Sequence, residues 1–214
     1  MKFRLIFHGQ IPSAGNKSRP NDAARIRKQF SSQLKFLWEN NKKLKDLQEN
    51  AFLEVPSSNT IVDPSLVTPR QKYNRNRQGW RPLLDCREYK DYNFLPLVTE
   101  SLSLGCEIDI LMLRQEEPGV LISQTGDIDG RVKVLFDALR MPKDQELDVT
   151  KDTNRPDPEE INYCLLEDDS LITGFTIDTD RLLFPETEHQ HECHIVMEVK
   201  VNVLTAGPHN MCLL

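Results

Sequence analysis

The sequence predicts an α+β fold in which a small mixed or antiparallel sheet packs against helices. Segments with alternating apolar residues, typical of strands, occur near both ends of the chain and in its middle. Between them lie two segments whose apolar residues recur at helical spacing. The resulting order of strand, helix, aperiodic segment, two strands, helix and two strands is typical of the α+β class. The 214 residues suit one domain, 1–214, with insertions at about 45–92 and 141–163.

The first part of the chain predicts one strand and one long helix. Residues 2–8 alternate well enough for a strand, and turn-forming residues follow them. Residues 21–48 predict a helix, because apolar residues recur at helical spacing and Asn21 or Asp22 is a suitable N-cap. Residues 50–92 are poorly periodic and are interrupted by four prolines, so we expect an insertion there.

The second part of the chain predicts four strands and one helix. Its helix ends before Pro142, because proline cannot continue a helix. The segment that follows is acidic, contains prolines and lacks an apolar face, which indicates the second insertion. The expected elements are strands at 93–101, 105–114, 170–183 and 194–204 and a helix at 131–140.

The charge of the chain is divided unevenly along its length. The net charge is -6, but residues 1–82 carry 16 basic and 6 acidic residues, a net charge of +10. Residues 83–214 carry 11 basic and 27 acidic residues, a net charge of -16. This division favours one surface that faces a polyanion and a separate acidic centre. A solvated basic helix and an acidic loop would give the same pattern.

The sequence favours a soluble cytoplasmic protein with no membrane partner. No apolar run approaches the roughly 18–20 residues that span a membrane, and the N-terminus lacks the features of a signal peptide. The five cysteines are odd in number, irregularly spaced and without a CxxC pair. We therefore expect free thiols and a reducing compartment.

The helix expected at 131–140 has two distinct faces. At about 100° per residue, Val132, Leu135 and Leu139 fall within an arc of about 60° and predict the stripe that faces the core. A second arc of similar width combines an acid, two cations and an aromatic ring. Its members are Asp129, Lys133, Phe136 and Arg140.

Carboxylates gather at two places that the fold could bring together. Asp127 and Asp129 lie two residues apart, and Mg²⁺ prefers such carboxylates together with water. Three acids, Glu167, Asp168 and Asp169, follow an apolar pair at a position poorly suited to a strand. Convergence of the two groups would form a centre for Mg²⁺-assisted phosphodiester hydrolysis. The alternatives are an N-cap with a solvated loop residue and an acidic turn.

These segments resemble one known family. The sequences DIDGRVKVLFDAL and LEDDSLI are similar to the DxD helix and the later Asp-Asp pair of the RusA-type Holliday junction resolvases. The start RLIFHGQIPSAGN, the basic helix and the final HIVMEVKVNV also fit, so the likeness covers roughly 1–40 and 103–204. The resemblance implies a RusA-like nuclease domain.

The resemblance also implies roles for individual residues. Asp127, Asp129 and Asp169 match the essential metal-binding acids, and Asp168 is the neighbouring acid of the pair. Lys133 matches the catalytic lysine, which would stabilise charge that develops on the phosphate. Phe136 matches a phenylalanine thought to wedge into the junction, although ordinary core packing would explain it as well.

The implied activity is that of a metal-dependent endodeoxyribonuclease of DNA recombination and repair, with Mg²⁺ as cofactor and Mn²⁺ as an alternative. A homodimer would cut four-way DNA junctions symmetrically, because a two-fold dimer presents one active site to each of two strands. The basic N-terminal surfaces would hold phosphates. The expected DNA-binding residues are Arg25, Lys28, Arg70, Lys72, Arg75, Arg77, Arg81 and Phe136.

Three departures from the family pattern leave alternatives open. Gly130 stands where the family has Asn after the DxD, which bears on catalytic efficiency, and the two insertions bear on substrate preference. One alternative is a non-catalytic or weakly active nucleic-acid-binding protein that retains the RusA-like fold. Another is a structural or interaction protein whose acidic cluster binds Ca²⁺.

Two further patterns are weaker. His189, His191 and Cys193 would share one face of a strand and have the side chains of a zinc site, but an exposed turn explains them as well. Tyr73 and Trp80 lie among arginines and could stack on unpaired bases, although a disordered basic loop would have the same composition.

Overall fold

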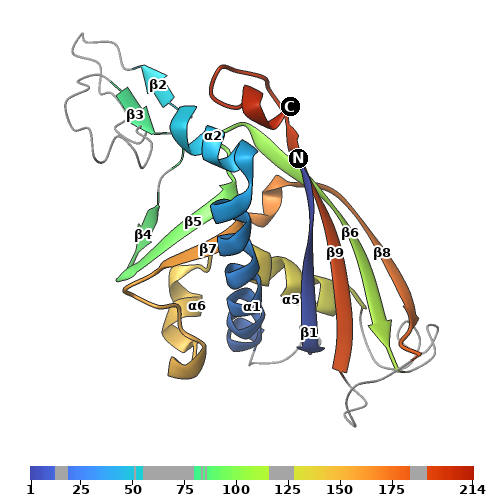
Figure 1. The fold of residues 1–214 in the computed structure, drawn as a ribbon. Helices are drawn as coiled ribbons and strands as arrows, with labels where there is room; N and C mark the ends of the chain where they lie inside the picture. The colour runs from blue at the N-terminus through green and yellow to red at the C-terminus, as the bar shows by residue number, and fades with distance from the viewer. Residues whose placement is uncertain are drawn as a thin grey trace.

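A computed structural model of the 214-residue chain shows an α+β architecture, as the sequence predicts (Figure 1). For residues 49, 50, 52–54 and 80–82 only the backbone is described. The residues that the structure describes are 1–12, 19–50, 52–54, 80–82, 84, 86–115, 128–183 and 192–214.

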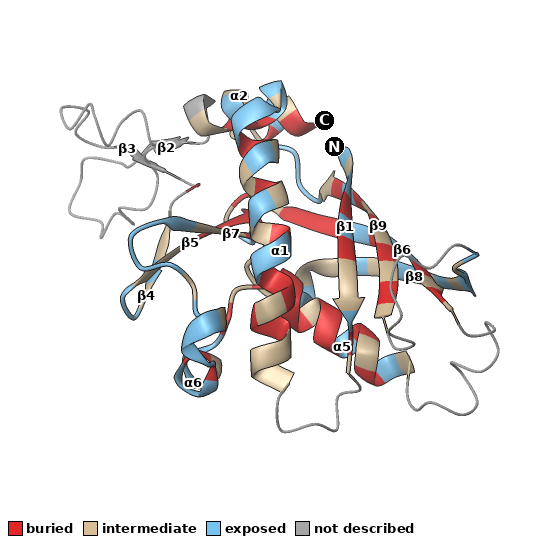
Figure 2. Cartoon of the chain, turned by 60° about the horizontal axis from the view of Figure 1, so that its bottom comes forward, coloured by how far each residue is buried: buried red, intermediate tan, exposed pale blue. Residues whose placement is uncertain are grey.

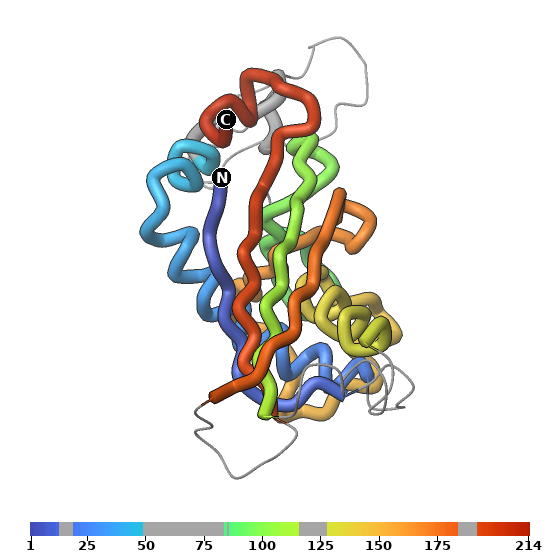
Figure 3. Tube along the Cα trace, turned by 90° about the vertical axis from the view of Figure 1, so that its right-hand side faces the viewer, coloured from blue at the N-terminus to red at the C-terminus, as the bar shows by residue number. Residues whose placement is uncertain are grey.

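The largest sheet has four strands in the order β1–β9–β6–β8. Strand β9 runs antiparallel to both β1 and β6, whereas β8 runs parallel to β6, so the sheet is mixed. Figure 3 shows the four strands side by side, with the helices behind them. Its strands are β1 (Lys2–Gln10), β9 (Glu192–Val203), β6 (Leu104–Arg114) and β8 (Ile172–Arg181).

A second mixed sheet has three strands in the order β4–β5–β7. Strand β5 pairs antiparallel with β4 and parallel with β7. A separate two-stranded ribbon joins β2 to β3. These strands are β4 (Arg87–Tyr89), β5 (Tyr92–Val98), β7 (Ile161–Leu166), β2 (Phe52–Glu54) and β3 (Trp80–Pro82).

The prediction of a single sheet was therefore wrong. The strand expected at 93–101 does form, as β5, but it belongs to the second sheet and pairs with β7. Strand β7 lies partly inside the segment expected as an insertion, 141–163. Its buried part, Cys164–Leu166, is too short to show a period, and acidic and polar residues precede it.

The described part of the chain contains four α-helices, which all lie on one side of the four-stranded sheet (Figures 1 and 3). None of them is long and apolar enough to cross a membrane. The described residues also form three short 3₁₀ turns: η1 (Asp152–Asn154), η2 (Asp169–Leu171) and η3 (Met211–Leu213). The helices are α1 (Arg19–Asn40), α2 (Lys42–Asn50), α5 (Ile128–Leu139) and α6 (Asp144–Val149).

The single helix expected at 21–48 is in fact two helices. The side chain of Asn41 accepts a hydrogen bond from the backbone N–H of Leu44 at 3.3 Å, so Asn41 starts α2 in the manner of an N-cap. The expected N-cap was also wrong, because α1 begins at Arg19. The Asn21 side chain instead accepts a hydrogen bond from Asn154 at 2.8 Å.

One large apolar core lies between the four-stranded sheet and the helices. The helical spacing in α1 correctly predicts its buried face, which includes Ile26, Phe30 and Trp38. Alternate residues of β6 and β9 point into the same core, as the strand periodicity predicts. Figure 2 shows buried residues concentrated in α1, α5 and the central strands, whereas α6 is largely exposed.

A buried ionic network fastens α5 to α1 and α6. Asp137 accepts hydrogen bonds from Arg19 Nε at 2.7 Å and from Arg140 Nη2 at 2.8 Å. Arg140 also donates to Glu146 at 2.6 and 3.1 Å. Arg27 of α1 donates to the backbone carbonyl of Arg140 at 3.0 Å. The network therefore fixes the helix that carries the expected catalytic residues.

The position of Arg140 corrects the sequence analysis, which grouped it with Lys133 on a single polar face of the helix. Arg140 is buried, although its backbone N–H still donates to the Phe136 carbonyl at 3.2 Å as in a helix. Asp137 and Glu146 then draw the guanidinium group inward.

Candidate metal and nucleic-acid site

The first turns of α5 present an acid and a lysine to solvent. Asp129 and Lys133 are both exposed and lie one helical turn apart. Neither side chain has a hydrogen bond or ion pair with another residue in the described ranges. Arg131 Nη1 donates to the backbone carbonyl of Ile11, which ties this end of α5 to the chain just after β1. Asp127, the other acid of the DxD, lies outside the described residues.

The buried face of α5 contains the residues predicted from the sequence and is wider than expected. Val132, Leu135 and Leu139 are all buried, as their spacing predicts. Val134 and Ala138 are buried too. The helix is covered on two sides because it packs against α1 as well as against the sheet. The exposed part of α5 is thus confined to the strip that carries Asp129 and Lys133.

The three acids after β7 have different surroundings. Glu167 is engaged in structure: its carboxylate pairs with Arg87 at 2.8 Å and accepts the backbone N–H of Glu100 at 3.2 Å. Asp168 accepts the backbone N–H of Ser170 at 3.0 Å and so caps η2. Asp169, the first residue of η2, is exposed. Glu167 is therefore committed to the fold, Asp168 is partly engaged by its cap, and Asp169 is the most exposed of the three.

Local interactions hold Asp168 in its ionised form. Hydrogen bonds from the side chain and then the backbone of Ser170 lower the pKa of the Asp168 carboxyl, and the nearby Lys143 ammonium acts in the same direction. A hydrogen-bond interaction with Asp169 contributes as well, so the two carboxyl groups are neighbours.

The fold brings the acid pair to α5. Helix α5 contacts η2, and the backbone N–H of Met141 donates to the carbonyl of Leu166 at 3.0 Å. The chain after α5 therefore lies against the strand that leads into Asp168 and Asp169.

The metal centre expected from the sequence needs a residue that the structure does not describe. Among the described residues, no three His, Cys, Asp or Glu side chains converge closely enough to hold a metal ion. The donor chemistry nevertheless fits Mg²⁺, because Asp129 and Asp169 offer exposed carboxylate oxygens. That Asp127, Asp129 and Asp169 converge on one metal ion stays a prediction.

Phe136 has a structural partner in this conformation. Its ring meets that of Phe175 in β8 edge to face, with centroids 5.2 Å apart and an interplanar angle of 84°. Phe136 is half-buried and Phe175 is 51% exposed, so this aromatic pair borders solvent at the edge strand of the sheet.

The two expected DNA-binding residues of α1 differ in their freedom. Arg25 is half-buried: it donates to the carbonyl of Gln10 and lies over the ring of Phe7, 5.8 Å from its centroid. Lys28 is exposed and has no ion pair with another residue in the described ranges. Arg81 lies in β3, opposite Leu53. The remaining basic residues expected to bind DNA, and an aromatic residue beside them, lie outside the described residues: Arg70, Lys72, Tyr73, Arg75 and Arg77.

The possible zinc ligands are only partly described. His189 and His191 lie outside the described residues. Cys193 points into the core, where its Sγ donates to the carbonyl of Gly9 at 3.1 Å. The next residue, His194, packs on His8 of β1 with ring centroids 4.1 Å apart. Cys193 and His194 thus have different surroundings, as the alternation of a strand requires.

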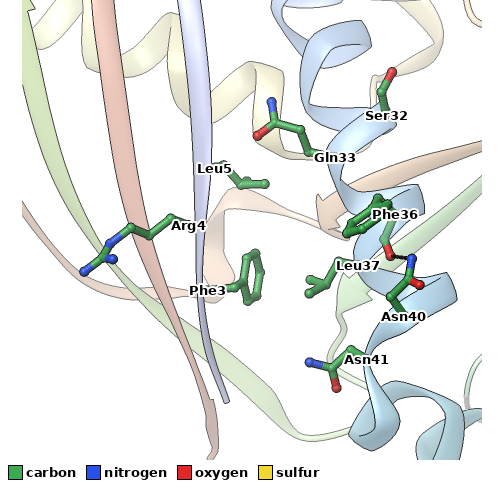
Figure 4. Close-up of a pocket in the computed structure, with 9 residues that line it drawn as sticks. All are labelled: Phe3, Arg4, Leu5, Ser32, Gln33, Phe36, Leu37, Asn40 and Asn41. Atoms are coloured by element: carbon green, nitrogen blue, oxygen red, sulfur yellow. Dashed lines mark hydrogen bonds between the residues drawn. The ribbon is translucent and has the colours of Figure 1, made fainter.

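A groove of about 510 Å³ lies between β1 and α1 (Figure 4). Its apolar lining includes Phe3 and the 68% exposed Phe36. Beside it the Gln33 amide pairs with both the N–H and the carbonyl of Ile6, at 2.9 and 2.6 Å, and so covers part of the free edge of β1. Among the described residues, those that line this groove are apolar, neutral polar or, in Arg4, basic.

Comparisons with known proteins leave the family open. No family model matches the chain, and searches of curated proteins and of solved structures return no significant match. The assignment of function must therefore be argued from the residues of this chain.

The sequence analysis missed two features of the structure. One is the role of Asp137, whose neighbours Val134 and Ala138 gave the available signal, since an acid between buried positions of a helix needs a partner. The other is a cavity between α1 and residues 154–163. The basic residues of α1 were the sequence signal that could have indicated it.

Proposed function

We propose that this chain is a Mg²⁺-dependent, structure-selective endodeoxyribonuclease with a RusA-like fold that resolves four-way DNA junctions in the cytoplasm. One observation carries the proposal. The solvent-facing strip of α5 presents Asp129 and Lys133, and the same helix contacts η2, which begins with Asp169. Residues about 40 positions apart in the sequence thus lie on neighbouring elements, which supports the combination that the resemblance implies.

In this proposal Asp127, Asp129 and Asp169 hold the metal, and Asp168 adjoins them. Mg²⁺, when bound, would lower the pKa of a water nucleophile and polarise the scissile phosphate. Lys133 would stabilise the charge that develops on the phosphate oxygens, because its ammonium is exposed on the same strip as Asp129. The hydrogen bonds from Ser170 would keep Asp168 ionised.

The proposed substrate and assembly follow from the symmetry of a junction. A homodimer would present one acidic centre to each of two strands, and Arg25 and Lys28 of both copies would border the DNA. Light scattering should give twice the chain mass of 24.7 kDa at micromolar concentration. A monomer mass would contradict paired cleavage while leaving single-strand nicking open to test.

The activity can be tested with a synthetic mobile four-way junction and a linear duplex of the same sequence. We expect symmetric nicks in the junction with Mg²⁺, no cleavage of the duplex, and no cleavage of either after chelation with EDTA. An intact junction at every Mg²⁺ and Mn²⁺ concentration, with the junction still bound, would refute the nuclease and favour the non-catalytic nucleic-acid-binding protein.

A further inference from the structure

A cavity of about 520 Å³ lies between α1 and the segment that runs from η1 into β7. One wall is the face of α1 around Lys28, and the other is residues 154–163, which fall in the insertion expected at 141–163. The backbone N–H of Tyr163 donates to Ser31 Oγ at 2.9 Å, which ties the two walls together. The insertion thus builds a recess against the helix.

The lining of this cavity has the opposite charge to the chain. The protein carries a net charge of -6, whereas the cavity is lined by four basic and two acidic residues. A net positive recess in an acidic protein is suited to an anionic ligand. The charged lining residues are Arg27, Lys28, Lys35, Arg155, Asp157 and Glu160.

The basic groups differ in how far they are already engaged. Lys35 pairs with Glu160 at 3.4 Å, and both side chains are substantially exposed. Arg155 pairs with Asp152 at 2.9 Å and donates Nε to the carbonyl of Thr150. Lys28 has no ion pair within the described ranges, so its ammonium is the group most available to a ligand.

Apolar, aromatic and neutral polar groups share the rest of the lining. Phe94 is fully buried behind it, so the half-buried Tyr163 is the aromatic ring that a ligand can reach. Ile161, which is 41% exposed, also lines it. A volume of this size lies in the range of ligand pockets, about 300–1,000 Å³, and far exceeds what a single inorganic phosphate fills. The chemistry therefore combines a recess for a flat apolar group with cations for a phosphate.

We propose that this cavity binds a nucleoside phosphate, with Lys28 holding the phosphate and the base lying against the apolar lining. The ligand is either a free nucleotide or an unpaired nucleotide of a DNA strand. This inference deepens the proposed function. It rests on that function only where the bound nucleotide belongs to a DNA strand. An acidic peptide would meet the same cations, but the accessible Tyr163 ring and Ile161 favour a base.

The test uses fluorescence anisotropy of a short fluorescein-labelled oligothymidylate with the full chain, and competition by dTMP and by oligoglutamate. Lys28→Glu should weaken binding about fivefold or more. Lys42→Glu on α2 is the matched control, because it changes the net charge equally at an exposed lysine that does not line the cavity. Ile161→Trp should block binding by filling the recess without a change of charge.

Competition then identifies the ligand. Displacement by dTMP assigns a free nucleotide, and retention of the oligothymidylate assigns a DNA strand. Equal weakening by Lys28→Glu and Lys42→Glu, unaltered binding by Ile161→Trp, no binding at all, or displacement by oligoglutamate would each overturn the proposal. Junction cleavage by the wild type and by Ile161→Trp separates the two ideas, because Ile161 is not among the residues proposed to border the junction, whereas Lys28 is. If the junction is cleaved but oligothymidylate binding does not depend on the cavity, only the cavity proposal is overturned. If oligothymidylate binding depends on the cavity but the junction is not cleaved, only the nuclease proposal is overturned.

Discussion

Replacing Asp137 by alanine should destabilise the fold more than the same replacement of any exposed acid. The Asp137 side chain is 8% exposed and joins Arg19 to Arg140, whose own side chain is 4% exposed. Removing one member of a buried ion pair costs about 3–5 kcal/mol, because the partner charge remains buried. Arg140 keeps its bonds to Glu146, so we expect the lower end, about 3 kcal/mol.

The assay is thermal and urea unfolding of both the variant and a matched control. For a chain of this length, a loss of about 3 kcal/mol corresponds to a fall in Tm of about 6–12 °C. Asp152→Ala is the control, because Asp152 pairs with Arg155 at the same i,i+3 spacing and 2.9 Å but is 90% exposed. Its loss should stay within about 1 kcal/mol. Equal losses in the two variants would refute the idea that burial makes the Asp137 network important.

Three other outcomes can be checked on the same protein. Asn210→Ala should cost about 2–3 kcal/mol in urea unfolding, because the fully buried amide bonds the carbonyl of Leu102 at 2.8 Å; a loss below about 1 kcal/mol would contradict this. The lowered pKa of Asp168 stabilises the fold above the carboxyl's unfolded pKa, and this gain is lost as pH falls through the folded pKa. Asp168→Asn should therefore flatten the fall of Tm between about pH 5 and pH 2, and an unchanged slope would contradict it. Burial raises the thiol pKa of Cys106 to about 12 and of Cys164 to about 11, so peptide mapping after native iodoacetamide treatment should find both unmodified.

The periodic elements were the predictable part of the fold. The apolar alternation of β6 and β9 and the stripe formed by Val132, Leu135 and Leu139 all place their residues in the core, as the sequence indicates. Each of these elements is long enough for a period of two or 3.6 residues to repeat.

The unpredicted parts depend on tertiary contacts or on single side chains. Strand β7 has only a short buried run, Cys164–Leu166, and it forms a strand because it pairs with β5. One asparagine, Asn41, divides the long basic helix. The apolar spacing continues across it and so does not indicate the boundary. Arg140 turns inward because its partner Glu146 comes from a helix that the sequence analysis did not expect.

The candidate site was predictable only as a set of residues. The sequence predicts that Asp129, Lys133 and Asp169 converge; the structure brings α5 into contact with η2, and the convergence of these side chains stays a prediction. The sequence also groups Glu167 with the acids, but Arg87 engages that carboxylate. A partner 80 positions away in the sequence, on β4 of the same sheet as β7, is not visible in the local pattern.

The central claim is tested most directly by measuring binding and cleavage of one end-labelled four-way junction by the wild type and by Asp129→Asn. Asp178→Asn on β8 is the matched control, because Asp178 is also an exposed aspartate but lies outside the proposed site. We predict that Asp129→Asn binds the junction at least as tightly as the wild type, since one repulsive charge near the phosphates is gone, and no longer cuts it with Mg²⁺. Asp178→Asn should cut normally. Cleavage by Asp129→Asn at the wild-type rate would contradict the account, and so would loss of binding and cleavage together in a folded variant.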